Sequence, residues 1–330
     1  MTPLPSHDDV LAAAARIRDR VVRTPMLRHP QLDRLTGATV LLKPEPLQRT
    51  GSFKLRGATN AILQLTDGTV VTHSSGNHGQ AVACAAAAAG LSATVFMPRD
   101  APAIKIESTQ AWGAHVIFYD RATDDRFKLA EDFSRDMGAT LVAPFDNAEV
   151  IAGQGTAALE LAFDARDAGL TMDAFLVCTG GGGLTAGSAL ALEGASPTTA
   201  VYAVEPEGWD DTARSLLAGS RVANPPGGST LCDALLAAMP GELTFAVNQT
   251  RLKGGLVVSD AEVIKAMEFA FRHFKLVLEP GGAVALAALL SGRLPVADRV
   301  IGVMLSGGNV DPAVFRRCLA APVGNEAGEH

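Results

Sequence analysis

Short apolar segments alternate with helical patterns along most of this 330-residue chain, and this alternation constrains the fold more than any other feature. Helices are expected from Lys54 onwards and at 78–89, 103–112, 122–137 and 154–168. Strands are expected at 40–42, 70–72, 93–97, 116–119, 141–143, 174–178, 201–204 and 300–305. Such alternation is typical of parallel sheets covered by helices on both faces. The predicted fold class is therefore α/β.

Composition narrows the class of protein. Hydrophobic residues make up 48% of the chain but aromatic residues only 5%, which predicts a core of Ala, Val and Leu. The net charge of −7 lends no support to nucleic-acid binding or to a polybasic membrane patch. The longest apolar run, 81–91, is too short to span a bilayer, and residues 1–9 lack the pattern of a signal peptide. A cytoplasmic protein is expected, with its four scattered cysteines reduced.

Lys54 is the residue that an ordinary surface position explains least well. It follows Phe53 and opens an apolar-periodic helix. A cation at a helix N-terminus opposes the helix dipole, although a solvated lysine there is the plain alternative. A Schiff base between Lys54 and an aldehyde cofactor would remove most of the conflict.

Three loops that follow predicted strands carry further chemistry: 74–78 (SSGNH), 180–183 (GGGG) and 306–309 (SGGN). Glycines between a strand and a helix let backbone N–H groups surround a phosphate. A tight turn is one alternative reading of 180–183. Dinucleotide binding is another, because Gly181-x-Gly183-x-x-Ala186 fits that fingerprint and Glu205 follows about twenty residues later. The late position of the loop and the presence of Lys54 favour a single phosphate.

The stretch 52–58 (SFKLRGA), together with those three loops in the same order, resembles the fold-type II pyridoxal-phosphate enzymes. This group includes the threonine and serine dehydratases and serine racemase, and the resemblance extends from about Thr24 to Asn309. It implies a tryptophan synthase beta-like fold with two parallel-sheet, three-layer domains. The large domain would comprise 1–68 and 145–330, with a small domain, 69–144, inserted into it. A homodimer is also expected.

The resemblance assigns a cofactor, pyridoxal 5′-phosphate, and the residues that hold it. Lys54 would bind the cofactor aldehyde and later act as the base, with Phe53 beside it. Asn77 would bond the 3′-oxygen, and the Ser306 hydroxyl would face the pyridine nitrogen. The phosphate would lie in the loop formed by Gly180, Gly181, Gly182 and Gly183.

A substrate site is expected at the second loop, where backbone amides would hold the substrate carboxylate. Its residues are Ser74, Ser75, Gly76, Asn77 and His78. A helix start with ordinary N-cap residues is the plain alternative. Ser75 has a second predicted role as an acid or base opposite Lys54, because serine racemases carry Ser there and threonine dehydratases tend to carry Ala. His78 is given no role in proton transfer.

An acidic stretch, 205–211 (EPEGWDD), is a candidate metal site. Glu205, Asp211 and the carbonyl of Trp209 match positions at which related racemases and dehydratases bind Mg²⁺ or Ca²⁺. Oxygen ligands suit such hard cations. Acidic residues in the first turn of a helix are the plain alternative.

The predicted function is a dehydratase that converts a β-hydroxy amino acid, L-threonine or L-serine first, to a 2-oxo acid and ammonia. An amino-acid racemase and a 3-hydroxyaspartate dehydratase are alternatives on the same scaffold. A nicotinamide-dependent oxidoreductase is more distant, and a binding protein without catalysis would not need Lys54. The stretch 230–234 (TLCDA) departs from the Thr-x-Ala-Asp-Gly that is frequent in the family, which leaves the preferred side chain open.

Overall fold

The computed structural model describes residues 4–320 except 67, 75 and 102. The strands are β1 (Thr39–Pro44), β2 (Thr69–His73), β3 (Ser92–Pro98), β4 (His115–Tyr119), β5 (Thr140–Leu141), β6 (Ala174–Cys178), β7 (Ala200–Pro206), β8 (Leu252–Val258) and β9 (Val300–Leu305). The α-helices are α1 (His7–Ile17), α2 (Pro30–Thr36), α3 (Lys54–Ile62), α4 (Asn77–Ala89), α5 (Ala103–Ala111), α6 (Arg126–Met137), α7 (Ala148–Asp167), α8 (Gly183–Ala195), α9 (Asp211–Ala218), α10 (Glu242–Arg251), α11 (Asp260–Phe269), α12 (Pro280–Leu290) and α13 (Pro312–Ala320). Short helical turns are η1 (Glu45–Leu47), η2 (Asp233–Leu235) and η3 (Ala270–Phe274).

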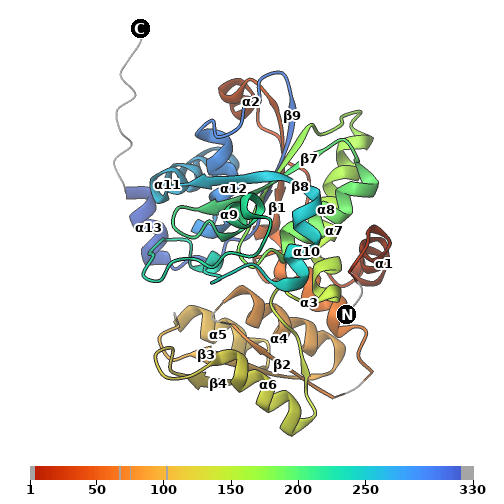
Figure 1. Cartoon of the computed structure of the whole chain (residues 1–330), viewed down its shortest axis with the longest axis vertical. Coiled ribbons are helices and arrows are strands. Elements are labelled where there is room, and N and C mark those ends of the chain that lie inside the picture. Colours follow the sequence, from red (N-terminus) through yellow and green to blue (C-terminus); the bar gives the residue numbers. More distant parts are fainter. Residues whose placement is uncertain (1–3, 67, 75, 102, 321–330) are drawn as a thin grey trace.

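The larger sheet has five strands in the order β1-β9-β6-β7-β8 and is parallel throughout. Helices α7 and α8 cover one side of it and α11 and α12 the other (Figure 1). Strand β9, the last of the described strands, lies between β1 and β6. The inside of the sheet therefore contains a strand that is distant in sequence from both of its neighbours.

The smaller sheet has four strands in the order β4-β3-β2-β5, is also parallel, and forms the lower part of the molecule in Figure 1 with α4, α5 and α6. All four strands come from residues 69–141. The predicted α/β class with parallel sheets is confirmed. The domain boundaries at 68/69 and 144/145 stay a prediction.

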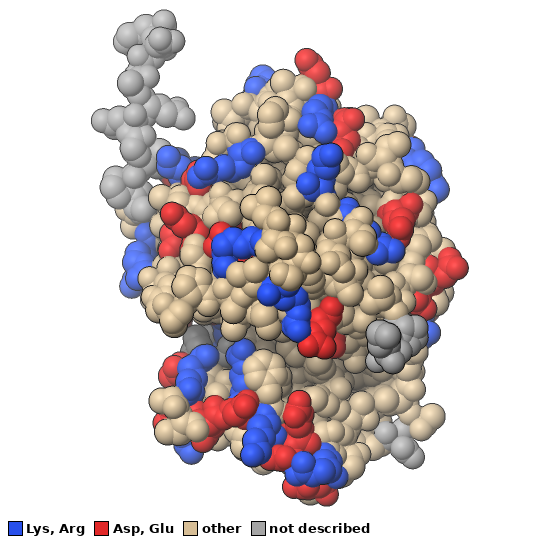
Figure 2. Space-filling model, viewed as in Figure 1, with Lys and Arg blue, Asp and Glu red and all other residues tan. Residues whose placement is uncertain are grey.

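The core has the composition that the sequence predicts, since its buried hydrophobic residues are mainly Ala, Val and Leu. One cluster lies between the larger sheet and α11–α12, and another lies between that sheet and α7–α8. The four cysteines are buried and free of disulfides. Among the described residues, no helix is both long and apolar enough to cross a membrane. On the face drawn in Figure 2, acidic and basic side chains are interspersed.

Several predicted element ends are wrong. Helix α6 begins at Arg126 rather than 122, because the Asp125 side chain accepts hydrogen bonds from the amides of Phe127 and Lys128 and so ends the preceding loop. Helix α7 begins at Ala148 rather than at 154. The side chain of Asn147 caps this start by accepting a hydrogen bond from the amide of Val150. In place of the strand expected at 141–143, the structure has the short strand β5 at Thr140–Leu141. Strand β8 was not predicted, because its two glycines mask the apolar pattern.

Glycines inside α7 and α8 let these two helices approach each other closely. A Cβ added at Gly155 would lie 2.4 Å from the carbonyl oxygen of Gly187, and one added at Gly187 would lie 2.3 Å from that of Ile151. Both distances are shorter than any real contact, so only glycine fits. Gly155 and Gly187 are therefore packing residues between these two helices.

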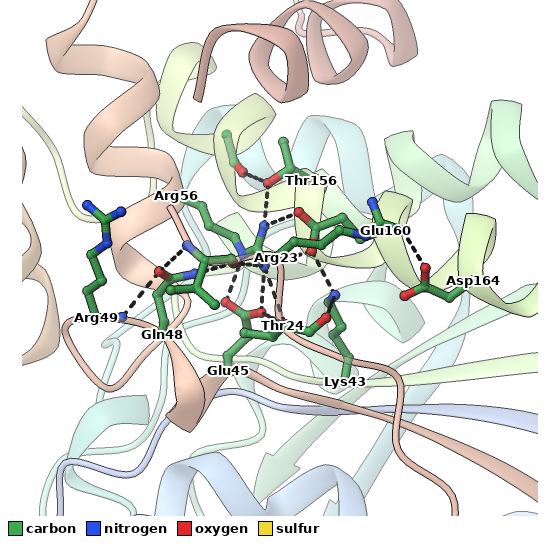
Figure 3. Close-up of polar contacts among 12 residues, drawn as sticks. Arg23, Thr24, Lys43, Glu45, Gln48, Arg49, Arg56, Thr156, Glu160 and Asp164 are labelled. Atoms are coloured by element: carbon green, nitrogen blue, oxygen red, sulfur yellow. Dashed lines mark hydrogen bonds and ion pairs between the residues drawn. The ribbon is translucent and has the colours of Figure 1, made fainter. Parts of the chain in front are cut away.

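A buried group of charges fixes the start of α3 (Figure 3). The guanidinium of Arg56 donates to both oxygens of Glu45, each at 2.8 Å, and to both oxygens of Glu160, at 2.8 and 2.9 Å. Lys43 Nζ donates to Glu160 at 2.7 Å and to the Thr24 carbonyl at 2.6 Å. The side chains of Arg56, Lys43 and Glu45 are fully buried. Burial works against the charged form of Glu160, yet Arg56 and Lys43 outweigh it and lower the pKa of this carboxyl.

Replacing Arg56 with Met should lower the free energy of unfolding by about 3–5 kcal/mol, because the fully buried Glu45 carboxylate would lose its cation and Glu160 would lose one of its two cations. Urea unfolding measures the change. The matched control is Arg135→Met, since Arg135 pairs with Asp132 and Asp136 on the exposed surface of α6. There the loss should be far smaller, because an exposed ion pair is screened by water and contributes little to stability. Equal losses in the two variants would contradict a structural role for the buried group.

Candidate active site

Lys54 is the first residue of α3, and its amine lies in a cavity of about 300 Å³ between the two sheets. The Lys54 Nζ donates a hydrogen bond to the carbonyl oxygen of Pro144 at 2.5 Å. Desolvation lowers the pKa of Lys54 to about 8, although the nearby Glu279 carboxylate favours the charged form. A fraction of an amine with such a pKa is neutral near pH 7–8. The neutral form is the one that acts as a nucleophile or a base.

The loop before Lys54 is attached to the loop after β9. Phe53 N donates to the Ser306 carbonyl at 3.1 Å, and Gly308 N donates to the Gly51 carbonyl at 2.9 Å. Phe53, Lys54 and Ser306 all line the cavity. Backbone hydrogen bonds therefore hold the loop before Lys54 next to Ser306, the residue predicted to face the ring nitrogen of the cofactor.

The glycine loop connects β6 to α8 and forms another wall of the cavity, which is lined by Gly180, Gly181, Gly182 and Gly183. Gly182 has a φ of 90°, which side-chain-bearing residues rarely adopt. A Cβ at Gly181 would lie 2.4 Å from the ring of Phe145. No side chain of the described residues caps the α8 N-terminus, which leaves its amides available to an anion.

Asn77, the first residue of α4, joins three separate parts of the chain. Its Nδ2 donates to Glu279 Oε1 at 2.6 Å, and its Oδ1 accepts from Asn309 Nδ2 at 2.8 Å. The structure thus brings Asn77 into the same cavity as Lys54, the glycine loop and Ser306.

Glu279 is a site residue that the sequence reading missed. It is 2% exposed, lines the cavity, and burial raises its pKa to about 7. Its second oxygen, Oε2, is buried and makes no hydrogen bond to any described residue. The only sequence signal is a glutamate directly before Pro280 at the start of α12, which is easily read as an ordinary helix start.

The other predicted substrate residues are placed as follows. Ser74 and Gly76 line the cavity, and the Ser74 hydroxyl accepts a hydrogen bond from the Gly76 amide at 3.2 Å. His78 Nε2 donates to the Val142 carbonyl at 2.9 Å. Burial, with a smaller contribution from Lys54, lowers the pKa of His78 to about 3, so its ring is neutral. Ser75 lies outside the described residues.

The acidic stretch lies away from the cavity, at the end of β7 and the start of α9. Both Glu205 oxygens accept backbone hydrogen bonds, from Thr212 N at 2.9 Å and Ala213 N at 2.8 Å. Asp211 Oδ1 accepts from Asn224, whereas its Oδ2 is buried without a partner among the described residues. Burial raises the pKa of Glu205 to about 8, helped by Asp211, and that of Asp211 to about 6.

Within the described residues there is no group of three or more His, Cys, Asp or Glu side chains that could hold a metal ion. Glu205 serves the helix start, as the plain reading of the stretch expected. The three-ligand set of Glu205, Trp209 and Asp211 stays a prediction.

Comparison with known proteins agrees with this geometry. The model of the family described as "Pyridoxal-phosphate dependent enzyme" matches residues 17–307. The chain is 40% identical over 313 residues to an L-threo-3-hydroxyaspartate ammonia-lyase of Saccharomyces cerevisiae, covering 93% of this chain and 94% of the relative. It is 40% identical to a serine racemase of Schizosaccharomyces pombe, covering 93% and 95%. Its structure is similar to that of a threonine deaminase from T.th., with 43% identity, a TM-score of 0.88, and coverage of 93% and 99%.

The residues of the cavity fit pyridoxal phosphate. The uncapped α8 N-terminus beside the glycine loop suits a phosphate, and the Lys54 amine, of lowered pKa, suits an aldehyde. The Ser306 hydroxyl is neutral and buried, which suits an uncharged ring nitrogen. The volume of about 300 Å³ is at the lower end of the range for small-molecule sites.

In protein freed of cofactor, the Lys54 amine should react with an amine-directed reagent along a titration curve with a midpoint near pH 8, its pKa being about 8. Glu279→Gln should shift the midpoint to lower pH, because the carboxylate that favours the charged amine is gone. Peptide mapping identifies the labelled lysine. Glu242→Gln, which removes an exposed carboxylate from α10, is the control. A midpoint that rises, or that moves equally in both variants, would show that Glu279 does not act on Lys54.

Proposed function

Because the chain belongs to the pyridoxal-phosphate dependent enzyme family, we propose that it eliminates water and then ammonia from a β-hydroxy amino acid, with 3-hydroxyaspartate ahead of threonine and serine. The observation that carries this proposal is the Lys54 amine, of lowered pKa, in a cavity with a surplus of cations on its wall.

Each part of the cofactor has a proposed partner in the cavity. Lys54 holds its aldehyde and Asn77 its 3′-oxygen. Ser306 faces its ring nitrogen, and the loop of Gly180–Gly183 holds its phosphate. When bound, the cofactor supplies an aldehyde that captures the substrate amine and a ring that withdraws electrons from Cα. Because a serine hydroxyl has no negative charge, it gives the ring nitrogen little reason to become protonated, which favours prompt loss of a β-substituent.

Lys54 carries the proposed proton transfer. In its neutral form, the Nζ takes the proton from the substrate Cα while the β-hydroxyl departs, so that one water molecule is lost overall. The unsaturated amine that remains takes up water and becomes a 2-oxo acid and ammonia. The lowered pKa of Lys54 is what makes the neutral amine available near neutral pH.

The charge on the cavity wall supports a substrate with two carboxylates. Lys105, Arg121 and Arg126 line the cavity in addition to Lys54, whereas its acidic residues are Asp233 and Glu279. This local surplus contrasts with the net charge of −7 for the whole chain. Relatives from Saccharomyces cerevisiae and a Pseudomonas species, 40% and 41% identical, are named L-threo-3-hydroxyaspartate ammonia-lyases.

Amino-acid racemisation is the second candidate, and the identity of Ser75 favours it. Racemisation requires an acid or base on each side of Cα, and a hydroxyl at Ser75 would act opposite Lys54. Relatives named serine racemases have a similar level of identity, 40% in Schizosaccharomyces pombe.

Rates of 2-oxo acid release should therefore be highest with L-threo-3-hydroxyaspartate and lower with L-serine and L-threonine, and Lys54→Ala should abolish them all. Chiral chromatography of the L-serine reaction measures D-serine in parallel. Borohydride treatment, which should fix the cofactor to Lys54 and remove its visible absorption, shows that the cofactor is bound. If L-serine gives mainly D-serine and little pyruvate, racemase replaces dehydratase.

The metal at the acidic stretch is proposed on Asp211 Oδ2, which is buried without a partner among the described residues and is the type of ligand that Mg²⁺ or Ca²⁺ takes. A chelator should lower the melting temperature, and Mg²⁺ should restore it, because an ion that binds only the folded protein stabilises it. Asp211→Asn should weaken this response. An unchanged melting temperature in the presence of chelator would leave Glu205 and Asp211 as parts of a helix start.

A homodimer and a cytoplasmic location stay predictions.

A further inference from the structure

An ion pair crosses the cavity from the smaller sheet's side to the larger sheet's side. Lys105, on α5, donates from Nζ to Oδ2 of Asp233, the first residue of η2, at 2.5 Å. The two residues are 128 positions apart in the sequence. Both line the cavity that holds the Lys54 amine. The pair is therefore part of the wall that any substrate must approach.

The two partners differ in how much they depend on each other. The Lys105 side chain is only 11% exposed, whereas that of Asp233 is 52% exposed. A nearly buried ammonium needs an anionic partner, because its desolvation is otherwise uncompensated. A half-exposed carboxylate can exchange its partner for water at little cost. Another carboxylate could thus replace Asp233 beside Lys105.

Lys105 also lies against the loop predicted to hold the substrate. A Cβ built on Gly76 would lie 3.5 Å from Lys105 Nζ, so the ammonium is in contact range of that loop on one side and of Asp233 on the other. The other acidic residue of the cavity, Glu279, is bonded to Asn77. Oxygen Oε1 of Glu279 is therefore engaged by Asn77 and not by Lys105.

We propose that Lys105 binds the β-carboxylate of a dicarboxylic substrate, and that the Asp233 carboxylate occupies this position until the substrate displaces it. The proposal rests on the proposed function and adds the residue that recognises the substrate. A carboxylate on Cβ replaces one charge-assisted hydrogen bond of Lys105 with another. The hydrogens or methyl group at the same place in serine or threonine cannot do so. Lys105 thus selects for 3-hydroxyaspartate.

The opposing roles of the two residues predict opposite effects of their substitution. Lys105→Met should lower kcat/KM for 3-hydroxyaspartate by about 10- to 100-fold, the loss expected for a hydrogen bond to a charged group, and should change that for L-serine by less than about threefold. Lys105→Arg should recover part of the loss, because it restores the charge. Asp233→Asn should lower KM for 3-hydroxyaspartate, because the competing carboxylate is gone.

The experiment compares these three variants with Lys128→Gln in the holoenzyme. Lys128 is an exposed residue of α6, outside the cavity, so this control removes the same charge from the same part of the molecule. Succinate and butyrate, which differ by one carboxylate, serve as competitive inhibitors. Succinate should inhibit the wild-type protein more strongly than butyrate, and Lys105→Met should remove this difference. Melting temperatures and the visible absorption of the cofactor show that each variant folds and is loaded.

The outcomes separate this inference from the proposed function. If the wild type does not convert 3-hydroxyaspartate but binds succinate through Lys105, the substrate assignment fails and the carboxylate site stands. If Lys105→Met lowers kcat/KM for L-serine and 3-hydroxyaspartate by the same factor, Lys105 serves the carboxylate common to both and the inference is overturned. An unchanged preference for succinate in Lys105→Met would overturn it as well.

Discussion

The guanidinium of Arg56 binds the buried carboxylate of Glu45 and the half-buried carboxylate of Glu160, and the position of Lys54 depends on it. Arg56 lies two residues after Lys54 on the same helix, and its partners belong to η1 and α7. Because both ion pairs are buried, moving α3 would separate charges in a medium of low dielectric constant. The reactive amine is thus held by a rigid element, while the residues around it come from loops.

Those loops converge because the strands of each sheet are parallel. The glycine loop follows β6, the 306–309 loop follows β9, and the 74–77 loop follows β2. Carboxyl ends of parallel strands meet at one edge of a sheet, where ligands usually bind in such folds. Here two such edges face one another across the cavity. The side chain of Asn77 spans them through its bonds to Glu279 and Asn309.

Much of this site could be predicted from the sequence, because Lys54, Asn77, the glycines and Ser306 lie in short motifs next to strands. The residues that escaped prediction act through contacts that are distant along the chain. Glu279 is read as a helix start until its carboxyl is seen 2.6 Å from an asparagine 202 positions away. Lys105 looks like a solvated lysine on a helix until Asp233 is seen beside it. No periodicity or motif encodes such pairings, because they depend on how the two sheets are placed.

The position of β9 in the larger sheet affects how the chain is made. Since β9 is the last strand of the sequence and pairs with both β1 and β6, neither of these can complete its ladder until residue 305 has left the ribosome. Throughout most of synthesis, two apolar strands expose unpaired N–H and C=O groups of the kind that draw chains into aggregates. A chain truncated before β9 would lack the strand that lies between β1 and β6 in the larger sheet. Assembly of the larger sheet therefore waits for the strand that is made last among those described.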